Sequence, residues 1–220
     1  MTVAALTDGS RYPARLTIEY PEHQNRLTTL LRVFMVIPIA IVLILVSGGG
    51  GSSTTVPTNG PSGTMRTTGA GIGASLTLAT ALMIIFRRRY PRWWFDFELA
   101  LARFSARVAA YGLLLRDEYP STEDEQAVHL ELDYPDASRD LNRWLPLVKW
   151  LLAIPHYVVL VLLGVQAVLA VLVAWVAILV TGRYPRPLFD FVVGTIRWVL
   201  RVQAYAFLLI TDRYPPFSLR

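Results

Sequence analysis

The chain has 220 residues, of which 54% are hydrophobic and only 17% are charged. The charged share is below the quarter typical of soluble domains, and the apolar residues form long blocks, so the composition predicts an integral membrane protein. Cysteine is absent, which excludes disulfides, iron–sulfur ligation and thiol nucleophiles. The net charge of +5 comes from arginines that flank the apolar blocks, which favours a role in membrane topology and argues against nucleic acid as a partner.

Two apolar blocks occupy the first half of the chain. They run from about residue 30 to 46 and from about 69 to 86, and each is long enough for a transmembrane helix. Residues 47–68, between them, are rich in Gly, Ser, Thr and Pro, which is typical of a flexible linker. No Gly-Lys-Ser/Thr follows the glycines, so a phosphate-binding loop is not indicated. The sequence therefore predicts two spans joined by a solvated loop.

The third apolar block, residues 145–180, is too long for one crossing, which needs about 20 residues. Gly164–Gln166 divide this block into two pieces of suitable length. We therefore expect a tight helical hairpin with spans at about 145–163 and 166–181. Together with the two earlier spans, this makes four transmembrane helices.

Two closely similar patterns begin at Arg89 and at Arg183, 94 residues apart. The stretches "RYPRWWFDFELALARFSARV" and "RYPRPLFDFVVGTIRWVLRV" keep Arg-Tyr-Pro, one Asp and two Arg at identical spacings. Upstream of each, apolar residues alternate with polar ones at 16–20 and 130–134, which suits a short half-buried strand. The sequence therefore predicts a tandem duplication with a first unit, residues 1–120, and a second unit, residues 121–220.

Each unit is predicted to contain a short strand, a transmembrane hairpin and an amphipathic interfacial helix, the last at about 93–115 and 188–210. A third spanning helix would carry one Asp and two Arg through the bilayer, which is costly. The predicted fold is an all-α integral membrane protein of two tandem units with four transmembrane helices. The arginines then place both termini and the central segment in the cytoplasm. We expect no cleavable signal peptide.

Positions i, i+7 and i+11 of a helix lie on nearly one line, so each amphipathic helix carries a narrow charged stripe. In one interpretation its Asp and Arg neutralise one another and lock the helix onto the hairpin. In the other, the arginines bind anionic phospholipid or acidic residues of a partner protein. With the arginine that opens each pattern, the candidate binding residues are Arg103, Arg107, Arg197, Arg201, Asp96, Asp190, Arg89 and Arg183.

Seven Tyr-Pro dipeptides occur, and each follows a charged residue. Proline keeps the preceding residue out of the helical conformation and Tyr favours the membrane interface, so we expect these dipeptides to end strands and helices at the membrane surface. Recognition of Tyr-Pro by a partner is the alternative. Pro38 and Pro155 are expected to kink their helices. His156, the ionisable residue deep inside an apolar block, is interpreted as a packed side chain.

The sequence contains no zinc-binding helix motif, nucleophile elbow or dinucleotide fingerprint, and it indicates no catalytic, cofactor-binding or metal-binding residue. We therefore expect a non-enzymatic accessory or scaffold protein of the bacterial plasma (inner) membrane. Its expected partners are anionic phospholipid and either another membrane protein or a second copy of the chain. The alternative is a small-solute or ion transport component, with a path between the units near Pro38, Pro155 and His156 or formed by oligomerisation.

The "RYPRWWFDF" and "RYPRPLFDF" blocks and the repeated Tyr-Pro boundaries also allow a comparison with known families. In these features the chain resembles actinobacterial membrane proteins classed as a domain of unknown function, which is often duplicated. The resemblance covers most of the chain apart from the Gly-rich loop and the extreme N-terminus. It implies a plasma-membrane location, and it brings no established activity or catalytic residues.

Overall fold

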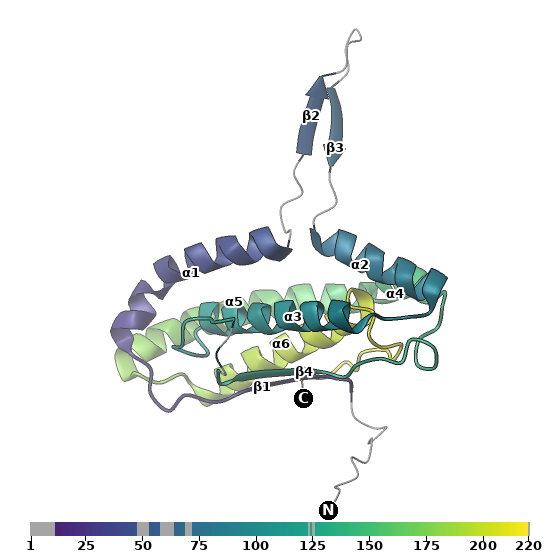
Figure 1. Ribbon diagram of the computed structural model, residues 1–220. Coiled ribbons are helices and arrows are strands. Elements are labelled where there is room, and N and C mark those ends of the chain that lie inside the picture. The colour runs from purple at the N-terminus through teal and green to yellow at the C-terminus, as the bar shows by residue number, and fades with distance from the viewer. Residues whose placement is uncertain are drawn as a thin grey trace, which may run out of the picture.

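The computed structural model describes residues 12–47, 53–57, 64–68, 72–122, 124 and 126–219. Most of the residues that the structure describes are helical. Its elements are shown in Figure 1, and they are, in chain order, β1 (Ala14–Ile18), α1 (Arg26–Ser47), β2 (Ser53–Pro57), β3 (Thr64–Thr68), α2 (Ile72–Leu82), the π-helical turn η1 (Met83–Arg87), α3 (Arg92–Gly112), β4 (Val128–Leu132), α4 (Pro146–Leu152), α5 (Ile154–Thr181) and α6 (Arg186–Ala206).

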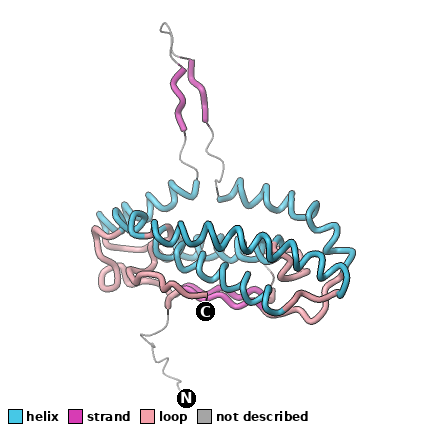
Figure 2. The backbone as a smooth tube through the Cα atoms, turned by 180° about the vertical axis from the view of Figure 1, so that it is seen from behind, coloured by secondary structure: helices cyan, strands magenta, loops and turns pink. Residues whose placement is uncertain are grey.

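The body of the protein is layered. Strands β1 and β4 form a two-stranded sheet, and helices α3 and α6 lie on it, α3 against β4 and α6 against β1. The apolar helices lie on the other side of α3 and α6, with α1 packed on α3 and α5 packed on α6 (Figures 1 and 2). The amphipathic helices α3 and α6 are therefore the middle of the molecule, between a polar sheet and an apolar helical layer.

The sheet joins one strand of each predicted unit. β1 and β4 are antiparallel, with Leu16 opposite Leu130 at the centre. The Glu19 N–H donates to the Ala127 carbonyl at 3.2 Å. Because hydrogen-bonded and non-hydrogen-bonded pairs alternate along an antiparallel ladder, Leu16 and Leu130 form a non-hydrogen-bonded pair. Their backbone groups point away from the partner strand, so the sheet leaves two central carbonyls for donors from outside it.

The amphipathic helices and the short strands occur where the sequence patterns predict them. α3 and α6 cover most of the predicted ranges 93–115 and 188–210. β1 and β4 show the expected alternation, with buried positions separated by exposed or partly exposed ones. The label all-α is nevertheless wrong, because these strands pair with each other across the two units. A strand pattern predicts a half-buried face, and only the fold decides which strand pairs with it.

The predicted hairpin at residues 145–181 is wrong. α4 is short, and α5 is one continuous helix of 28 residues that runs through Gly164 (Figure 1). The break lies at Ala153, and Pro155 is in the first turn of α5 rather than at a kink, since proline there lacks only an N–H that has no helical acceptor. A single glycine inside a helix costs only about 1 kcal/mol, which an apolar helix packed along α6 can absorb.

Four transmembrane helices are not supported. Within the described residues, α5 alone is long and apolar enough to cross a membrane as a single helix. A second candidate arises only if Arg26–Arg32 and Phe34–Ile44, which meet at 49°, are taken together as one bent span. This bend in α1 lies about one turn before Pro38, where the proline ring crowds the carbonyl four residues earlier. The apolar helical stretch Leu76–Arg87 is too short to qualify.

The Gly-rich segment, expected as a flexible linker over residues 47–68, contains two paired strands. β2 and β3 form an antiparallel hairpin with Thr55 opposite Arg66. Threonine is β-branched and favours strands, and this propensity prevails here over the composition of the whole segment. The rest of the expected linker, residues 48–52 and 58–63, lies outside the described residues.

Candidate functional site

The charged stripes of α3 and α6 bind the sheet. The Arg103 Nε donates to the Leu130 carbonyl at 3.1 Å, and the Arg197 Nε donates to the Leu16 carbonyl at 2.8 Å. These are the two central carbonyls that the strand pairing leaves without a partner. Because α3 precedes β4 and α6 follows β1 by a long stretch of chain, each arginine joins a helix of one predicted unit to the strand of the other.

The second arginine of each stripe also binds a backbone carbonyl. The Arg107 Nη1 donates to Ser121 at 2.6 Å, and the Arg201 Nη1 donates to Ser218 at 3.1 Å. Each helix thereby holds the irregular segment that follows it. All four arginines singled out as lipid-binding candidates therefore donate to the protein's own backbone.

The two stripe aspartates behave differently. Asp96 and Asp190 are exposed, and neither forms an ion pair within the part of the chain that the structure describes. The expected neutralisation of Asp by Arg along one helix does not occur. The reason is that the backbone carbonyls of the neighbouring strand and loop lie closer to the guanidinium groups than an aspartate two to three turns away.

Tyrosines of the Tyr-Pro dipeptides join the two units. The Tyr20 hydroxyl donates to the Tyr184 carbonyl, and the Tyr134 hydroxyl donates to the Tyr90 carbonyl. The same two rings also receive cations, as Arg186 lies 4.3 Å from the ring centre of Tyr20 and Arg92 lies 5.1 Å from that of Tyr134. These dipeptides therefore end secondary-structure elements, as predicted, and in addition fix one unit against the other.

A buried ion pair in each unit was missed by the sequence analysis. Lys149 is fully buried, and its Nζ lies 2.7 Å from the Asp212 Oδ1 and 5.2 Å from the ring centre of Tyr205. Arg32, also buried, pairs with Asp117 and lies 4.9 Å from the ring centre of Tyr111. A signal was present, because each aspartate stands two residues before a Tyr-Pro dipeptide and each cation six residues before an Ile-Pro.

Glu98 is a third buried charge, and it has no counterpart in the second unit, where Val192 stands at the matching position. Its carboxyl contacts the Tyr90 hydroxyl, and its Oε1 lies 3.1 Å from the Thr80 hydroxyl. Burial raises the pKa of Glu98 to about 7, although the bonds from Tyr90 and Thr80 oppose the shift. This cluster ties α2 to α3 and is enclosed within the helical layer.

His156 is packed, as the sequence analysis interpreted it. Its Nδ1 accepts a hydrogen bond from the Trp198 indole at 3.1 Å, and its ring stacks on Phe217 with centroids 4.1 Å apart. The residue is fully buried between α5, α6 and the C-terminal segment. Pro38 belongs to α1 and is exposed, whereas His156 lies buried at the start of α5.

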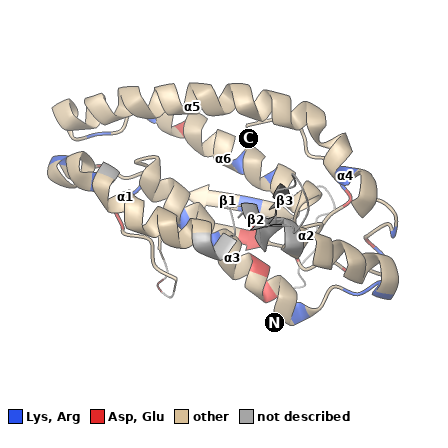
Figure 3. Cartoon of the chain, turned by 90° about the horizontal axis from the view of Figure 1, so that it is seen from above, with Lys and Arg blue, Asp and Glu red and all other residues tan. Residues whose placement is uncertain are grey.

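The outer face of the apolar layer is exposed. Along α5 the small residues Ala167, Ala170 and Ala174 pack inward, while large aliphatic side chains of the same helix point outward. The exposed aliphatic side chains include Val158, Val161, Leu162, Val165, Val168, Leu172 and Val176. Figure 3 shows α5 without a charged residue along its length. Exposed apolar patches of this extent mark sites of contact with a membrane or another protein.

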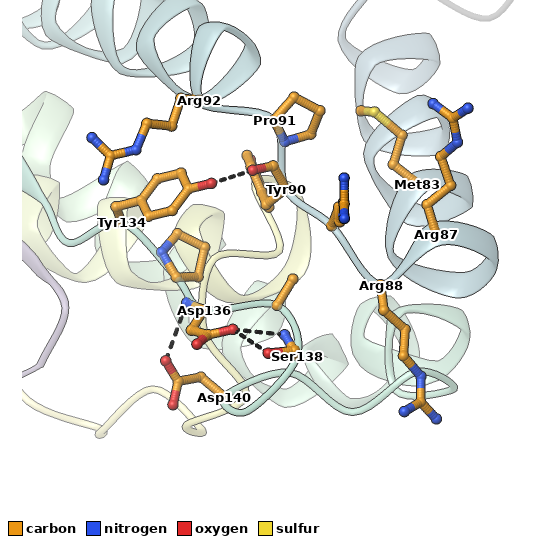
Figure 4. A pocket seen from close by; sticks show the side chains of 13 residues that line it. Met83, Arg87, Arg88, Tyr90, Pro91, Arg92, Tyr134, Asp136, Ser138 and Asp140 are labelled. Carbon is orange, nitrogen blue, oxygen red and sulfur yellow. Dashed lines mark hydrogen bonds between the residues drawn. The ribbon is translucent and has the colours of Figure 1, made fainter.

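An open cavity of about 1110 Å³ lies where η1 leads into α3 (Figure 4). One wall is the basic segment Arg87–Arg92, together with Met83 of η1. The other wall is Tyr134–Asp140, the segment that follows β4. The cavity therefore lies at the boundary between the apolar layer and the polar sheet side. Of the eight predicted site residues, only Arg89 lines it.

The two aspartates of this cavity are already engaged. Asp136 accepts hydrogen bonds from the Ser138 N–H at 3.0 Å and from its hydroxyl at 2.5 Å, and Asp140 accepts from the Asp136 N–H at 3.2 Å (Figure 4). The bonds to Ser138 hold the pKa of Asp136 below its usual value. Within the described residues, no group of three or more His, Asp and Glu is arranged to hold a metal ion.

Comparison with known proteins gives one match. Residues 144–218 match a family described as a domain of unknown function (DUF4389). This stretch contains α4, α5, α6 and most of the C-terminal segment. No curated protein and no solved structure matches the chain. The match thus covers the helices of the second unit and attaches no activity to them.

Proposed function

We propose that this protein is a non-enzymatic scaffold or accessory subunit of the bacterial plasma membrane. In this proposal its apolar layer is immersed in one leaflet and its helices lie parallel to the membrane plane. The observation that carries the proposal is the exposed aliphatic face of α5, which lies on the opposite side of the body from the charged outer face of the sheet.

The packing of α6 along α5 supports an in-plane orientation. The 28 residues of α5 measure about 42 Å, and α6 runs back along them and packs on them. If α5 crossed the bilayer, Arg197 and the strand it binds would lie at the depth of the acyl chains. The exposed pairs of Arg15 with Glu131 and Asp133 on that sheet would lie there too, at a high cost. With α5 in the plane, all these charges lie in water.

The same orientation agrees with the expected topology. β1, near the start of the described chain, and the C-terminal segment both lie on the sheet side of the body (Figure 1). We therefore place both on the cytoplasmic side. The β2–β3 hairpin has two open edges, whose unpaired backbone groups exclude it from hydrocarbon. Figure 1 shows it beyond the ends of α1 and α2, on the side of the body away from the sheet, so we place it in the water on the far side of the membrane.

We also infer that the chain is a duplicated form of the domain that residues 144–218 match. The support is the recurrence of contacts at matching positions of the two units. Arg103 and Arg197 make equivalent contacts at matching positions, and so do Tyr134 and Tyr20 and the buried pairs of Arg32 and Lys149. Independent evolution of so many equivalent contacts would be improbable.

The test uses the absence of cysteine in the natural chain, which makes single-cysteine variants clean probes. Spin labels at Val161, Val168 and Val176, all exposed on α5, would be compared for depth in phosphatidylcholine vesicles. An in-plane helix gives the same depth at all three positions. A greater depth at Val168 than at its neighbours would indicate a spanning helix and contradict the proposal.

A second readout concerns the two sides of the membrane. Thr17→Cys on the outer face of the sheet and Thr55→Cys in β2 would be treated with a membrane-impermeant maleimide in sealed vesicles. The proposed placement of the hairpin predicts labelling from opposite sides. Labelling of both positions from the same side would contradict this placement of the hairpin.

A further inference from the structure

We propose that the cavity between Arg87–Arg92 and Tyr134–Asp140 binds the phosphate of an anionic phospholipid headgroup. This inference rests on the proposed function, because it requires the apolar layer to be in the membrane. The lipid-binding arginines are then not those of the stripes, because the stripe arginines donate to backbone carbonyls. They are the arginines that line the cavity. The argument depends on the charge of the cavity, the free donors on its wall, one unusual backbone conformation and the position of the cavity in the layers.

The charge of the cavity is positive. Four arginines, Arg87, Arg88, Arg89 and Arg92, line it against two aspartates. The aspartates accept hydrogen bonds from within their own loop, and the exposed Arg139 lies 3.9 Å from Asp136. Because both aspartates already have hydrogen-bond donors, they do not neutralise the arginines. The arginines of the cavity therefore still need a counter-charge.

Three of these arginines have no side-chain acceptor among the described residues. Arg87, Arg88 and Arg89 are exposed, and no side-chain hydrogen bond or ion pair engages any of them within the described part of the chain. Arg92 differs, because its guanidinium stacks on Tyr134. Arginine presents a planar fork of donors that matches phosphate oxygens in a bidentate arrangement. Figure 4 shows Arg87 and Arg88 pointing in different directions from the end of η1, so the donors are spread along this wall, and their exposed side chains can turn toward a phosphate.

Arg88 has an unusual backbone conformation for an arginine. Arg88 has φ 48°, in the left-handed region, and ends η1. The matching position in the second unit is Gly182, with φ 73°, and Thr181 matches Arg87. A left-handed residue other than glycine costs roughly 1–2 kcal/mol. The first unit thus has an arginine at a position where glycine is easier to accommodate, and such strain commonly accompanies function.

The equivalent place in the second unit is occupied by the chain itself. The Gln24 N–H donates to the Gly182 carbonyl at 3.0 Å, and a side chain on Gly182 would lie 3.7 Å from the Arg26 Nε. The segment before α1 therefore lies against Gly182. The second unit thus has its own chain at the place where the first unit has Arg87 and Arg88 beside the cavity.

The position of the cavity favours a lipid over free phosphate. Its lining runs from Met83, in the apolar layer, to Ser138 and Asp140, on the sheet side. Phe86 and Trp93, which flank the arginines in sequence, are 73% and 68% exposed. Aromatic side chains of this kind favour the membrane interface, where headgroups lie. If the phosphate of a phospholipid lay inside the cavity, the acyl chains of that lipid would therefore lie beside the exposed side chains of η1 and α2.

The test is the double variant Arg87→Thr/Arg88→Gly, which gives the first unit the residues of the second. This variant is expected to fold, since Thr181 and Gly182 occupy the same backbone positions, and the glycine relieves the strain at position 88. A single variant, Arg89→Gln, serves as a second probe that leaves the end of η1 unchanged. The control is Arg15→Gln/Arg26→Gln, which removes the same charge from outside the cavity.

Binding would be measured to vesicles of phosphatidylcholine alone and of phosphatidylcholine with phosphatidylglycerol. The natural protein is expected to bind both and to prefer the anionic vesicles. The Arg87→Thr/Arg88→Gly variant is expected to lose about tenfold or more in affinity for the anionic vesicles, as the loss of charged hydrogen bonds to phosphate implies, and to keep its binding to phosphatidylcholine. The control is expected to keep most of the preference.

The outcomes separate the two proposals. Failure of the natural protein to bind phosphatidylcholine vesicles would contradict the proposed function. Binding to phosphatidylcholine with equal losses in the cavity variant and the control would reduce the preference to net charge and overturn the headgroup site. The natural protein could instead bind inorganic phosphate through Arg87 and Arg88 and show no preference for anionic vesicles. That result would overturn the headgroup site in favour of a free-phosphate site.

Discussion

The buried ion pair of Lys149 and Asp212 predicts an asymmetry between its two partners. Lys149 is fully buried, whereas the Asp212 side chain is 21% exposed and also accepts a hydrogen bond from the Asn142 N–H. In the Asp212→Asn variant, Lys149 keeps its bond to the Thr211 carbonyl at 2.7 Å but loses its counter-charge. An uncompensated buried charge costs about 3–5 kcal/mol. In the Lys149→Met variant, the aspartate can be hydrated, so we expect a cost of only about 1 kcal/mol.

The double variant is the sharper measurement. Because Lys149→Met removes the charge that Asp212→Asn strands, the double variant should be more stable than Asp212→Asn alone. Thermal unfolding in detergent, followed by tryptophan fluorescence, would give Asp212→Asn a Tm lower by about 6–20 °C for a chain of this length, and the double variant should recover most of that loss. Equal losses for the two single variants, without recovery, would refute the burial argument.

The equivalent pair of Arg32 and Asp117 supplies the matched control, since arginine cannot release its proton in a protein. Burial lowers the pKa of Lys149, although Asp212 opposes this shift. Without Asp212, the folded state releases the Lys149 proton before the unfolded state does, so its stability rises with pH. The destabilisation by Asp212→Asn should therefore shrink as pH rises, and that by Asp117→Asn should not. The same pH dependence in both variants would contradict this reasoning.

Four further predictions concern substitutions at single positions. The pKa of Glu98, about 7 when folded against the usual 4.5, means that the folded state binds the extra proton, so stability should fall by about 3 kcal/mol as pH rises from 4.5 to 7. Glu98→Gln should flatten this profile, and an unchanged profile would refute the assignment. A side chain on Gly194 would lie 2.7 Å from a backbone oxygen of the C-terminal segment, so Gly194→Ala should lower stability by about 1–3 kcal/mol. Gly164→Ala, with open space around it, should instead raise stability by roughly 0.5–1 kcal/mol, unless a turn rather than a helix is formed there. In chemical unfolding Arg197→Gln should cost about 1–3 kcal/mol, because it strands a sheet carbonyl, whereas Asp190→Asn should stay within about 0.5 kcal/mol.

The sequence located the amphipathic elements because their patterns are local. The stripe spacing placed α3 and α6 within a few residues of their observed bounds, and period-2 alternation located β1 and β4. Tyr-Pro dipeptides marked the ends of elements because proline restricts its own neighbour. None of these inferences needs to know what an element packs against.

The structure of the apolar blocks could not be predicted in this way. Hydropathy indicates that a helix avoids water, but it does not indicate whether lipid or protein covers that helix. The block at 145–180 was assumed to cross the membrane and, being too long for one crossing, was divided at Gly164. In the protein, α6 packs along α5 over its length, and that support keeps the helix continuous. The count of four spans was wrong for the same reason.

The candidate site depended most on the tertiary structure. Sequence spacing identified the arginines of the two stripes, yet their acceptors, the carbonyls of Leu16 and Leu130, become available only when β1 pairs with β4 in one register. The cavity arginines are adjacent in the sequence, and only folding sets them opposite Tyr134–Asp140. The sequence by itself determined which helix faces and strands are amphipathic and where they end. The tertiary structure decided which charges are consumed in holding the two units together and which remain for a ligand, because that depends on the backbone groups that distant segments bring within hydrogen-bond distance.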